Sequence, residues 1–345
     1  MPFSVVIPLH NKESTVLRSV ESVLRQTEQP EAIIVVDDGS TDGGVEQLSR
    51  SEFWTSVSLL RQRQSGPGIA RNAGWARCES DWVAFLDADD VWSPDHLAVL
   101  RRLIEEFPDV EWVSSSSKLV MNQAILRPAD FARFRWPIRA VRKRAAGTRA
   151  SYFDLARSRA VLPNSSSTAV RTQTLQAVGG FADVLPNEDL ALWCALALRG
   201  NIGHSAVQTV EIHRGVANIT DDLRQRDARR HCEDAFALAA RPHFVRVATA
   251  LEREQLDPRL RVSAERYLDH LLLRHWPTVI VQETQACARQ ASVLVRRKWH
   301  WRYVLFAVAA HLPKKAASFL ALIGTRLLRS LRIEVPVSPF VHRQS

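Results

Sequence analysis

The stretch Trp82-Val-Ala-Phe-Leu-Asp-Ala-Asp-Asp90 is the most informative one for the fold, because five apolar residues are followed directly by several acids. An unbroken apolar run of this length is typical of a strand buried on both faces of a parallel sheet. Earlier in the chain, Ile33-Ile-Val-Val-Asp-Asp-Gly-Ser-Thr-Asp42 repeats the pattern. In an open α/β sheet, ligands bind at the carboxyl ends of the strands. Both acidic strand ends are therefore candidates for a binding site.

Around these two stretches, strand patterns alternate with helix patterns through the first 110 residues. The predicted strands are Ser4–Pro8, Ala32–Val36, Val57–Leu60 and Trp82–Leu86, and the predicted helices are Ser14–Thr27, Val45–Ser51, Gly68–Arg77 and Pro94–Phe107. This rhythm predicts an α/β fold with a mainly parallel, Rossmann-like sheet flanked by helices. Further along, the sequence predicts strands at 110–115, 166–170 and 206–213 and helices at 172–178 and 190–197.

The charge of the chain is unevenly distributed. Residues 1–223 hold 24 of the 46 Lys and Arg but 27 of the 37 Asp and Glu, so the positive excess lies in the remainder. A change in composition near residue 220 predicts a first domain over 1–220 and a helical, basic C-terminal region over 221–345. Within that region, 314–332 has the composition of an interfacial helix, which predicts peripheral contact with an anionic membrane. A helix that packs on its own domain is the alternative.

Composition and cysteine spacing exclude several classes of protein. With 46% hydrophobic and 24% charged residues, the chain is neither disordered as a whole nor a disulfide-stapled mini-protein. Its four cysteines are far apart and form no CxxC pair, which is typical of a reducing compartment. The apolar stretch 3–9 has only seven residues, no basic region before it and no small-residue cleavage site after it, so we do not expect a signal peptide. No stretch reaches the roughly 18–20 apolar residues of a membrane span. We therefore expect a cytoplasmic protein, peripheral on the inner face of the cell membrane.

The acids at the two strand ends have residue types that suit a nucleotide and a metal. Along an extended chain, Asp87 and Asp89 project to the same side, where both can reach one hard cation or a ribose. A carboxylate of Asp37 or Asp38 can accept a hydrogen bond from a base N–H or a ribose hydroxyl. The alternative for both stretches is a solvated, Asp-rich turn, since turns are built from such residues.

Several further motifs make the chain resemble a known family. They are Ser4-Val-Val-Ile-Pro-Leu-His-Asn-Lys-Glu13, Ser22-Val-Leu-Arg-Gln-Thr27, Gly68-Ile-Ala-Arg-Asn-Ala-Gly74, Val178-Gly-Gly-Phe181 and Asn187-Glu-Asp-Leu190, together with the two acidic stretches. In this order they resemble family 2 of the nucleotide-sugar glycosyltransferases, which have the GT-A fold. The resemblance covers about residues 3–220. It implies a nucleotide-binding half at 1–110 and an acceptor half at 111–220.

The resemblance also implies roles for single residues. The nucleotide-sugar site would comprise Pro8, His10, Glu13, Asp37, Asp38, Arg71, Asp87, Ala88, Asp89 and Glu188. The family often has Tyr at the position of His10. Asp89, with Asp87 and His213, would hold Mn²⁺ or Mg²⁺. Asp189 would be the catalytic base of an inverting transfer, although its place at a helix start also suits an N-terminal cap. Arg71 would either contact phosphate or brace the acidic strand end.

The resemblance implies an enzyme that transfers a sugar from a nucleotide donor, expected to be UDP-linked, to a hydroxyl of a glycan or lipid-linked acceptor. The product would belong to cell-surface polysaccharide or lipopolysaccharide. One alternative is a nucleotidyltransferase, but 10–13 is not the Gly-rich triphosphate loop that such an enzyme needs. Another is a noncatalytic protein whose basic tail binds nucleic acid or membrane. No nucleic-acid recognition motif supports it, so nucleic acid is not an expected partner.

Overall fold

The computed structural model describes residues 2–121, 124–125, 147–158, 163–183, 188–214, 246–247, 250–251 and 255–268. The chain divides into two compact units, one of residues 1–222 with 257–263 and one of residues 223–256 with 264–345. The predicted interfacial helix at 314–332 lies outside the described residues.

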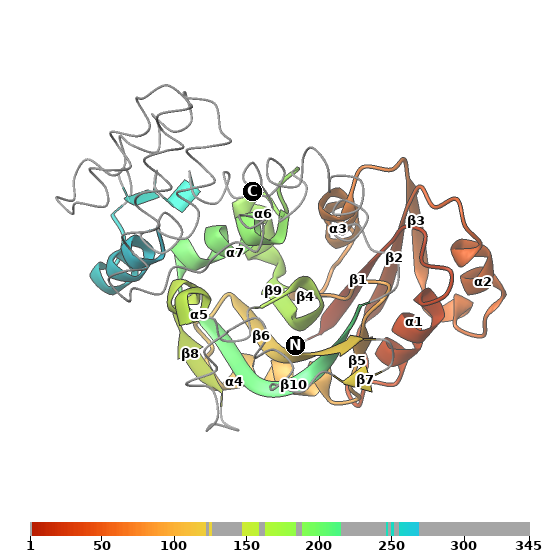
Figure 1. The fold of residues 1–345 in the computed structure, drawn as a ribbon, viewed down its shortest axis with the longest axis horizontal. Helices are drawn as coiled ribbons and strands as arrows, with labels where there is room; N and C mark the ends of the chain where they lie inside the picture. Colours follow the sequence, from red (N-terminus) through yellow and green to blue (C-terminus); the bar gives the residue numbers. More distant parts are fainter. Residues whose placement is uncertain are drawn as a thin grey trace, which may run out of the picture. The chain divides into compact units, whose positions relative to one another are not determined.

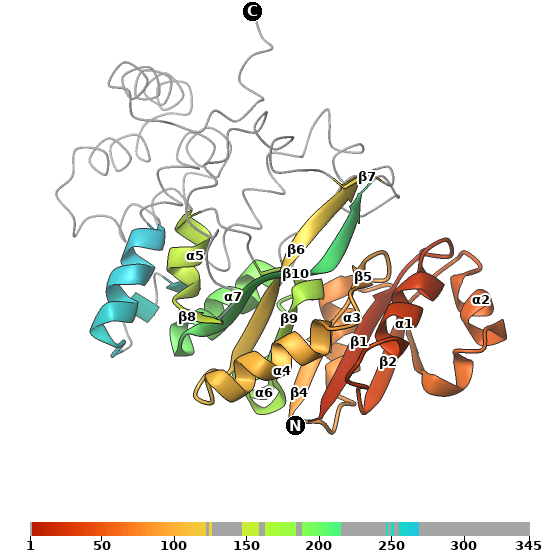
Figure 2. The same ribbon diagram turned by 90° about the horizontal axis from the view of Figure 1, so that it is seen from below.

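The strands of the described residues form one sheet (Figures 1 and 2). They are β1 (Phe3–Leu9), β2 (Ala32–Asp38), β3 (Ser58–Gln62), β4 (Trp82–Phe85), β5 (Val91–Trp92), β6 (Trp112–Met121), β7 (Ala124–Ile125), β8 (Thr148–Ala150), β9 (Thr168–Arg171) and β10 (Ile202–Arg214). Their order is β3-β2-β1-β4-β9-β6-β10-β5, with β7 paired to β6 and β8 to β10. The long ladders of β1 with β2, β2 with β3 and β6 with β10 are parallel. β9 runs antiparallel to both β4 and β6.

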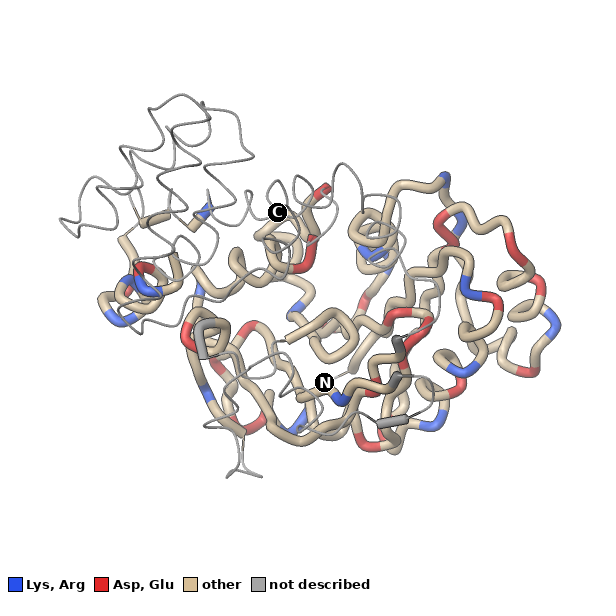
Figure 3. The backbone as a smooth tube through the Cα atoms, viewed as in Figure 1, with Lys and Arg blue, Asp and Glu red and all other residues tan. Residues whose placement is uncertain are grey.

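Helices cover both faces of this sheet. They are α1 (Val16–Leu24), α2 (Gly44–Arg50), α3 (Pro67–Trp75), α4 (His96–Glu106), α5 (Tyr152–Ser158), α6 (Thr172–Val178) and α7 (Glu188–Arg199), with 3₁₀ turns η1 (Trp54–Ser56) and η3 (Ser165–Ser167). The α/β fold expected from the sequence is confirmed. In Figure 3 acidic and basic residues are interspersed along the described backbone.

The alternation of side chains along β1 explains why both faces need a cover. Val5 and Ile7 belong to one apolar cluster with residues of α1 and α4, and all of them are buried. Val6 points to the opposite face, where α3 packs so closely that a Cβ added to Gly74 would lie 2.3 Å from Val6 Cγ1. Burying each such side chain contributes about 1.5–3 kcal/mol. A strand that is apolar on both faces is therefore held between two helical layers.

The sheet topology brings the acidic strand ends together. β2 and β4 both pair with β1 in parallel, so the carboxyl ends of the three strands lie at one edge. Asp37 and Asp38 end β2, His10 follows β1, and Asp87 follows β4 within two residues. Among the described residues, no helix has both the length and the apolar character to cross a membrane.

Candidate active site

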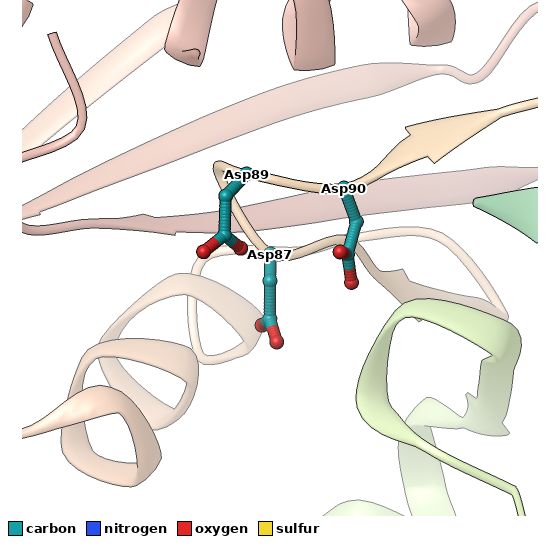
Figure 4. Close-up of side chains that lie close together, drawn as sticks. All are labelled: Asp87, Asp89 and Asp90. Atoms are coloured by element: carbon teal, nitrogen blue, oxygen red, sulfur yellow. The ribbon is translucent and has the colours of Figure 1, made fainter. Parts of the chain in front are cut away.

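Three carboxylates gather where the chain leaves β4. Oxygen atoms of Asp87, Asp89 and Asp90 lie within 4.8 Å of one another, and Figure 4 shows the three side chains pointing to the same side of their turn. Asp90 is the most buried, with 4% of its surface exposed. Because like charges disfavour ionisation, such a group needs positive charge or hydrogen-bond donors nearby.

Two basic side chains supply part of that charge. Lys12, from the turn after β1, places Nζ 2.7 Å from Asp89 Oδ2, and the side chains are 13% and 14% exposed. Arg71, from α3, donates from Nη2 to Asp87 Oδ1 at 2.5 Å. Arg18 also donates to the Asp89 carbonyl at 3.0 Å. The strand end is thus held by cations from three segments, which are the turn after β1, α1 and α3.

Arg71 joins the acid cluster to a second part of the site. Its Nη1 donates to Glu188 Oε1 at 2.8 Å, and its side chain is 4% exposed. Burial lowers the pKa of Arg71, but Asp87 and Glu188 outweigh this effect and raise it above its ordinary value. The guanidinium also lies over the Phe181 ring, 5.2 Å from its centroid. Arg71 thus contacts the acidic strand end, as the bracing role considered from the sequence would require.

The Asp90 carboxylate accepts hydrogen bonds from two donors that are distant in sequence. Ser166 of η3 donates its hydroxyl to Asp90 Oδ2 at 2.6 Å. The backbone N–H of His213 in β10 donates to Asp90 Oδ1 at 3.2 Å. Burial, and then the charges of Asp87 and Asp89, raise the pKa of Asp90 well above its ordinary value. Asp90 therefore ties the acidic turn to β10.

Asp189 lies in the first turn of α7, one residue after Glu188. Its Oδ1 accepts the backbone N–H of Leu190 at 2.7 Å. Burial and the neighbouring charge of Glu188 raise the pKa of Asp189 to about 7, although the charge of Arg71 opposes this rise. A carboxylate with a pKa near neutrality is well matched to general base catalysis at physiological pH.

The residues that follow β1 and β2 form a hydrogen-bonded network. Asp38 accepts from Gln62 Nε2 at 2.7 Å and from the backbone N–H groups of Ser65 and Gly66, both at 2.8 Å. The carboxylate of Asp38 thus fixes the loop before α3, and any contact with a base would come in addition to these bonds. Asp37 Oδ1 accepts the Ser40 N–H at 2.9 Å.

His10 connects the first strand to this network. Its Nδ1 lies 2.9 Å from the Asp38 carbonyl and its Nε2 lies 3.1 Å from Gln64 Nε2. A proton on Nδ1 and a lone pair on Nε2 satisfy both contacts, because the carbonyl only accepts and the Gln64 amide donates. Pro8 lies two residues earlier in β1, opposite Val36.

Glu13 is directed toward α2. Its Oε2 accepts the Gly43 N–H at 3.3 Å and its Oε1 accepts from Gln47 Nε2 at 3.3 Å. It lines a cavity of about 360 Å³ together with residues that include Leu17 and Arg50. The Glu13 carboxylate therefore stabilises the start of α2, while the Glu13 backbone lies in the turn after β1, next to the acidic strand ends.

The donor set of the acidic turn fits a hard divalent cation. Mg²⁺ and Mn²⁺ prefer carboxylate oxygens, and three such groups face one another within 4.8 Å. Ala88, between the two acids, is buried with 2% exposure. His213 is not in this group of described residues, since its Nε2 lies 3.3 Å from Glu211 Oε2. Burial and the charge of Arg18 lower the pKa of His213 below its ordinary value.

Three residues of the site were not predicted individually from the sequence. Asp90 had a signal, since it directly follows the Asp87-Ala88-Asp89 motif. Lys12 was visible only as a neighbour of Glu13, and nothing marks the pairing with an acid 77 positions away. Ser166, which donates to Asp90, lies in a run of serines without any local signal.

Comparison with known proteins identifies the domain. Residues 4–159 match the family described as "Glycosyl transferase family 2". The succinoglycan biosynthesis protein ExoW of Rhizobium meliloti is 39% identical over 117 residues, which are 32% of this chain and 37% of that protein. The minor teichoic acid biosynthesis protein GgaA of Bacillus subtilis is 31% identical over 119 residues, 32% of this chain and 26% of that protein. The matches thus span little more than a third of these relatives at most.

A solved structure extends the likeness in fold beyond the family match. The crystal structure of S. aureus TarS 1-349 in complex with UDP-GlcNAc has a TM-score of 0.67 and covers 96% of this chain and 92% of that chain. At 16% sequence identity this likeness concerns the fold alone. Residues 4–159, less than half of the chain, thus match the family 2 glycosyltransferases, and the α/β fold is the GT-A fold expected from the sequence.

Proposed function

We propose that the chain is an inverting, metal-dependent glycosyltransferase that moves a sugar from a nucleotide donor to an acceptor hydroxyl. One observation carries the proposal. The acid cluster after β4 and the first turn of α7 are joined through Arg71, which contacts both Asp87 and Glu188. The link supports the proposal because it joins three clustered carboxylates, which could hold a metal ion, to a carboxylate of raised pKa.

The donor would be held on the side of the acid cluster. Asp89 and Asp87 would hold Mn²⁺ or Mg²⁺, with Asp90 as a further carboxylate near the ion. When bound, such a cation stabilises the negative charge that develops on a departing nucleoside diphosphate. Pro8, His10, Asp37 and Asp38 line the adjoining strand ends and would receive the nucleotide.

Asp189 would act on the acceptor side. The sugar carbon gains oxocarbenium character as the leaving group departs. An acceptor hydroxyl has a high pKa and needs a base as it attacks the opposite face of the sugar. Asp189 Oδ1 is engaged by the Leu190 N–H, so Oδ2 is the oxygen we assign to proton uptake. Glu188 is occupied by Arg71 and would position the start of α7 instead.

Relatives and neighbours support the choice of substrates. TarS 1-349 was crystallised with UDP-GlcNAc, which favours a UDP-sugar donor for this chain. ExoW is named for succinoglycan biosynthesis and GgaA for teichoic acid biosynthesis. We therefore propose an acceptor on a growing cell-surface glycan or its lipid-linked precursor. Work at the inner face of the membrane, through the basic C-terminal region, is part of the same proposal.

The test is a transfer assay with a panel of nucleotide sugars, Mn²⁺ and lipid-linked or oligosaccharide acceptors. Both Asp89→Ala and Asp189→Asn should abolish transfer. Asp189→Asn should nevertheless leave donor binding nearly intact, as measured by calorimetry with UDP. Asp109→Asn is the matched control, since Asp109 pairs with Arg149 and is 54% exposed. Wild-type transfer rates in Asp89→Ala or Asp189→Asn would contradict the assigned roles.

Membrane contact has its own measurement. Flotation of the full chain with vesicles should require anionic lipid and should weaken as salt rises, because the attraction of a basic surface is screened. Equal flotation with neutral vesicles would contradict an electrostatic contact. Binding of duplex DNA at the same salt would favour the nucleic-acid alternative.

A further inference from the structure

Lys12 occupies the place where a divalent cation would contact Asp89. Its Nζ lies 2.7 Å from Asp89 Oδ2, and both side chains are largely buried. The Lys12 ammonium therefore neutralises the charge of Asp89, which is one of the proposed metal ligands. A cation that binds Asp89 must compete with it, because two positive charges on one carboxylate repel each other.

The backbone around Lys12 fixes this placement. Asn11 has a positive φ of 52°, which turns the chain after β1. Its side-chain Oδ1 accepts the Thr41 N–H at 2.8 Å, and the Lys12 carbonyl accepts the N–H of Val16 at the start of α1. Lys12 is thus anchored on both sides. The ion pair results from this anchored turn and is not a chance contact of a mobile surface side chain.

The two cations of the cluster differ in how readily they can leave it. Arg71 is 4% exposed and bridges two carboxylates with separate nitrogens. Lys12 is 13% exposed and contacts the cluster through a single ammonium on a flexible four-carbon stem. A divalent ion would therefore displace Lys12 and leave Arg71 in place.

Resting on the proposed function, we propose that Lys12 is a resident counter-ion which divalent metal must displace, and which then contacts the diphosphate of the donor. Lysine binds phosphate well as a point charge. The displacement of Lys12 couples metal binding to nucleotide binding, because a diphosphate that binds the released ammonium favours binding of the metal. The same coupling requires metal to favour nucleotide binding by an equal factor. Without donor, Lys12 keeps the affinity for metal low.

The test measures Mn²⁺ binding to the full chain by electron paramagnetic resonance of free Mn²⁺, first without nucleotide. Lys12→Met should bind Mn²⁺ about tenfold more tightly than wild type, a change that corresponds to about 1.4 kcal/mol. Lys12→Arg keeps the charge and should stay near wild type. Lys12→Gln is measured beside Lys12→Met, so that the comparison does not depend on the folding of one variant.

The matched control is Arg101→Met, which removes one positive charge from an ion pair with Glu28 outside the acid cluster and should leave Mn²⁺ affinity unchanged. Addition of UDP should raise the Mn²⁺ affinity of wild type by a larger factor than that of Lys12→Met. Equal Mn²⁺ affinity in wild type, Lys12→Met and Lys12→Gln would overturn the proposal, as would an equal effect of UDP on wild type and Lys12→Met. Failure of every nucleotide sugar in the transfer assay would remove the proposed function without changing the nucleotide-free comparison.

Discussion

Replacement of Arg71 by methionine would leave two carboxylates without their shared cation. Arg71 is 4% exposed, Glu188 is 11% exposed and Asp87 is 36% exposed. Removal of one partner from a buried ion pair costs about 3–5 kcal/mol. Because solvent screens the more exposed Asp87, we expect the lower end, about 3 kcal/mol. For a unit of this size, that loss lowers the thermal midpoint by roughly 6–12 °C.

The same substitution should change the pH dependence of transfer. The charge of Arg71 favours the ionised form of Asp189 and so lowers its pKa against the effects of burial and Glu188. Without that charge, the pKa of Asp189 rises above its value of about 7. A base works only when ionised, so the profile of kcat/KM should move to higher pH. A purely structural role for Arg71 would lower the midpoint and leave this profile in place.

The assay combines thermal unfolding with the pH profile. Arg71→Lys keeps the charge but cannot present two separate donors, so it should recover the pH profile better than the stability. Adding Glu188→Gln to Arg71→Met removes one of the orphaned charges, and should restore part of the lost midpoint. Two results together would contradict the role assigned to Arg71. They are a loss of stability below about 1 kcal/mol in Arg71→Met, which is within the range of exposed ion pairs, and an unchanged pH profile of kcat/KM.

Three further predictions follow from single contacts. Gly74→Ala would place a Cβ 2.3 Å from a side-chain carbon of β1, and should cost about 1–3 kcal/mol in urea unfolding; Gly200→Ala, which meets open space, should be nearly neutral. Burial lowers the pKa of His96 from 6.5 to about 3. As the pH falls below 6.5, His96 is therefore protonated in the unfolded chain before it is protonated in the folded chain, and stability that is present above pH 6.5 is lost. His96→Phe should therefore lose less stability than wild type below pH 6.5, by up to about 1.4 kcal/mol per pH unit, and parallel losses in urea titrations would contradict this. Wild-type kcat/KM should rise with pH to half its maximum near 7, the value to which burial and its acidic neighbour raise the pKa of Asp189; a profile flat from pH 5 to 8 would argue against that base.

β1, β2 and β4 could be predicted because each is an apolar run that is buried along nearly its whole length, whereas β3, at the edge of the sheet, is only partly buried. The later strands were harder to place. β6 continues to Met121, past the predicted end at Ser115, because its buried serines have partners from elsewhere in the chain. Ser117, for example, accepts a hydrogen bond from Asn164 Nδ2 at 2.7 Å. A run of serines indicates an exposed segment unless those distant partners are known.

β9 begins at Thr168, two residues after the predicted start of this strand at Ser166, for a similar reason. Ser165–Ser167 forms a 3₁₀ turn closed by a capping box with Asn164. Ser166 in that turn donates to Asp90, so tertiary bonding overrides the local preference for a strand. The acids of the site were predictable, since strand ends are where α/β sheets bind ligands. Arg71 was also expected in the site, but its pairing with Glu188, 117 positions away, and that of Lys12 with Asp89, 77 positions away, could not be predicted from local sequence.

The place of β9 in the sheet has a consequence for biosynthesis. β9 lies between β4 and β6, although β6 is made first. During translation β4 remains an open edge of the β3-β2-β1-β4 segment until Thr168–Arg171 leaves the ribosome. Exposed edges invite pairing with other chains. A truncation that ends before β9 would therefore produce a sheet half with an unprotected edge, prone to aggregate, whereas one that ends after β10 would keep the edge closed.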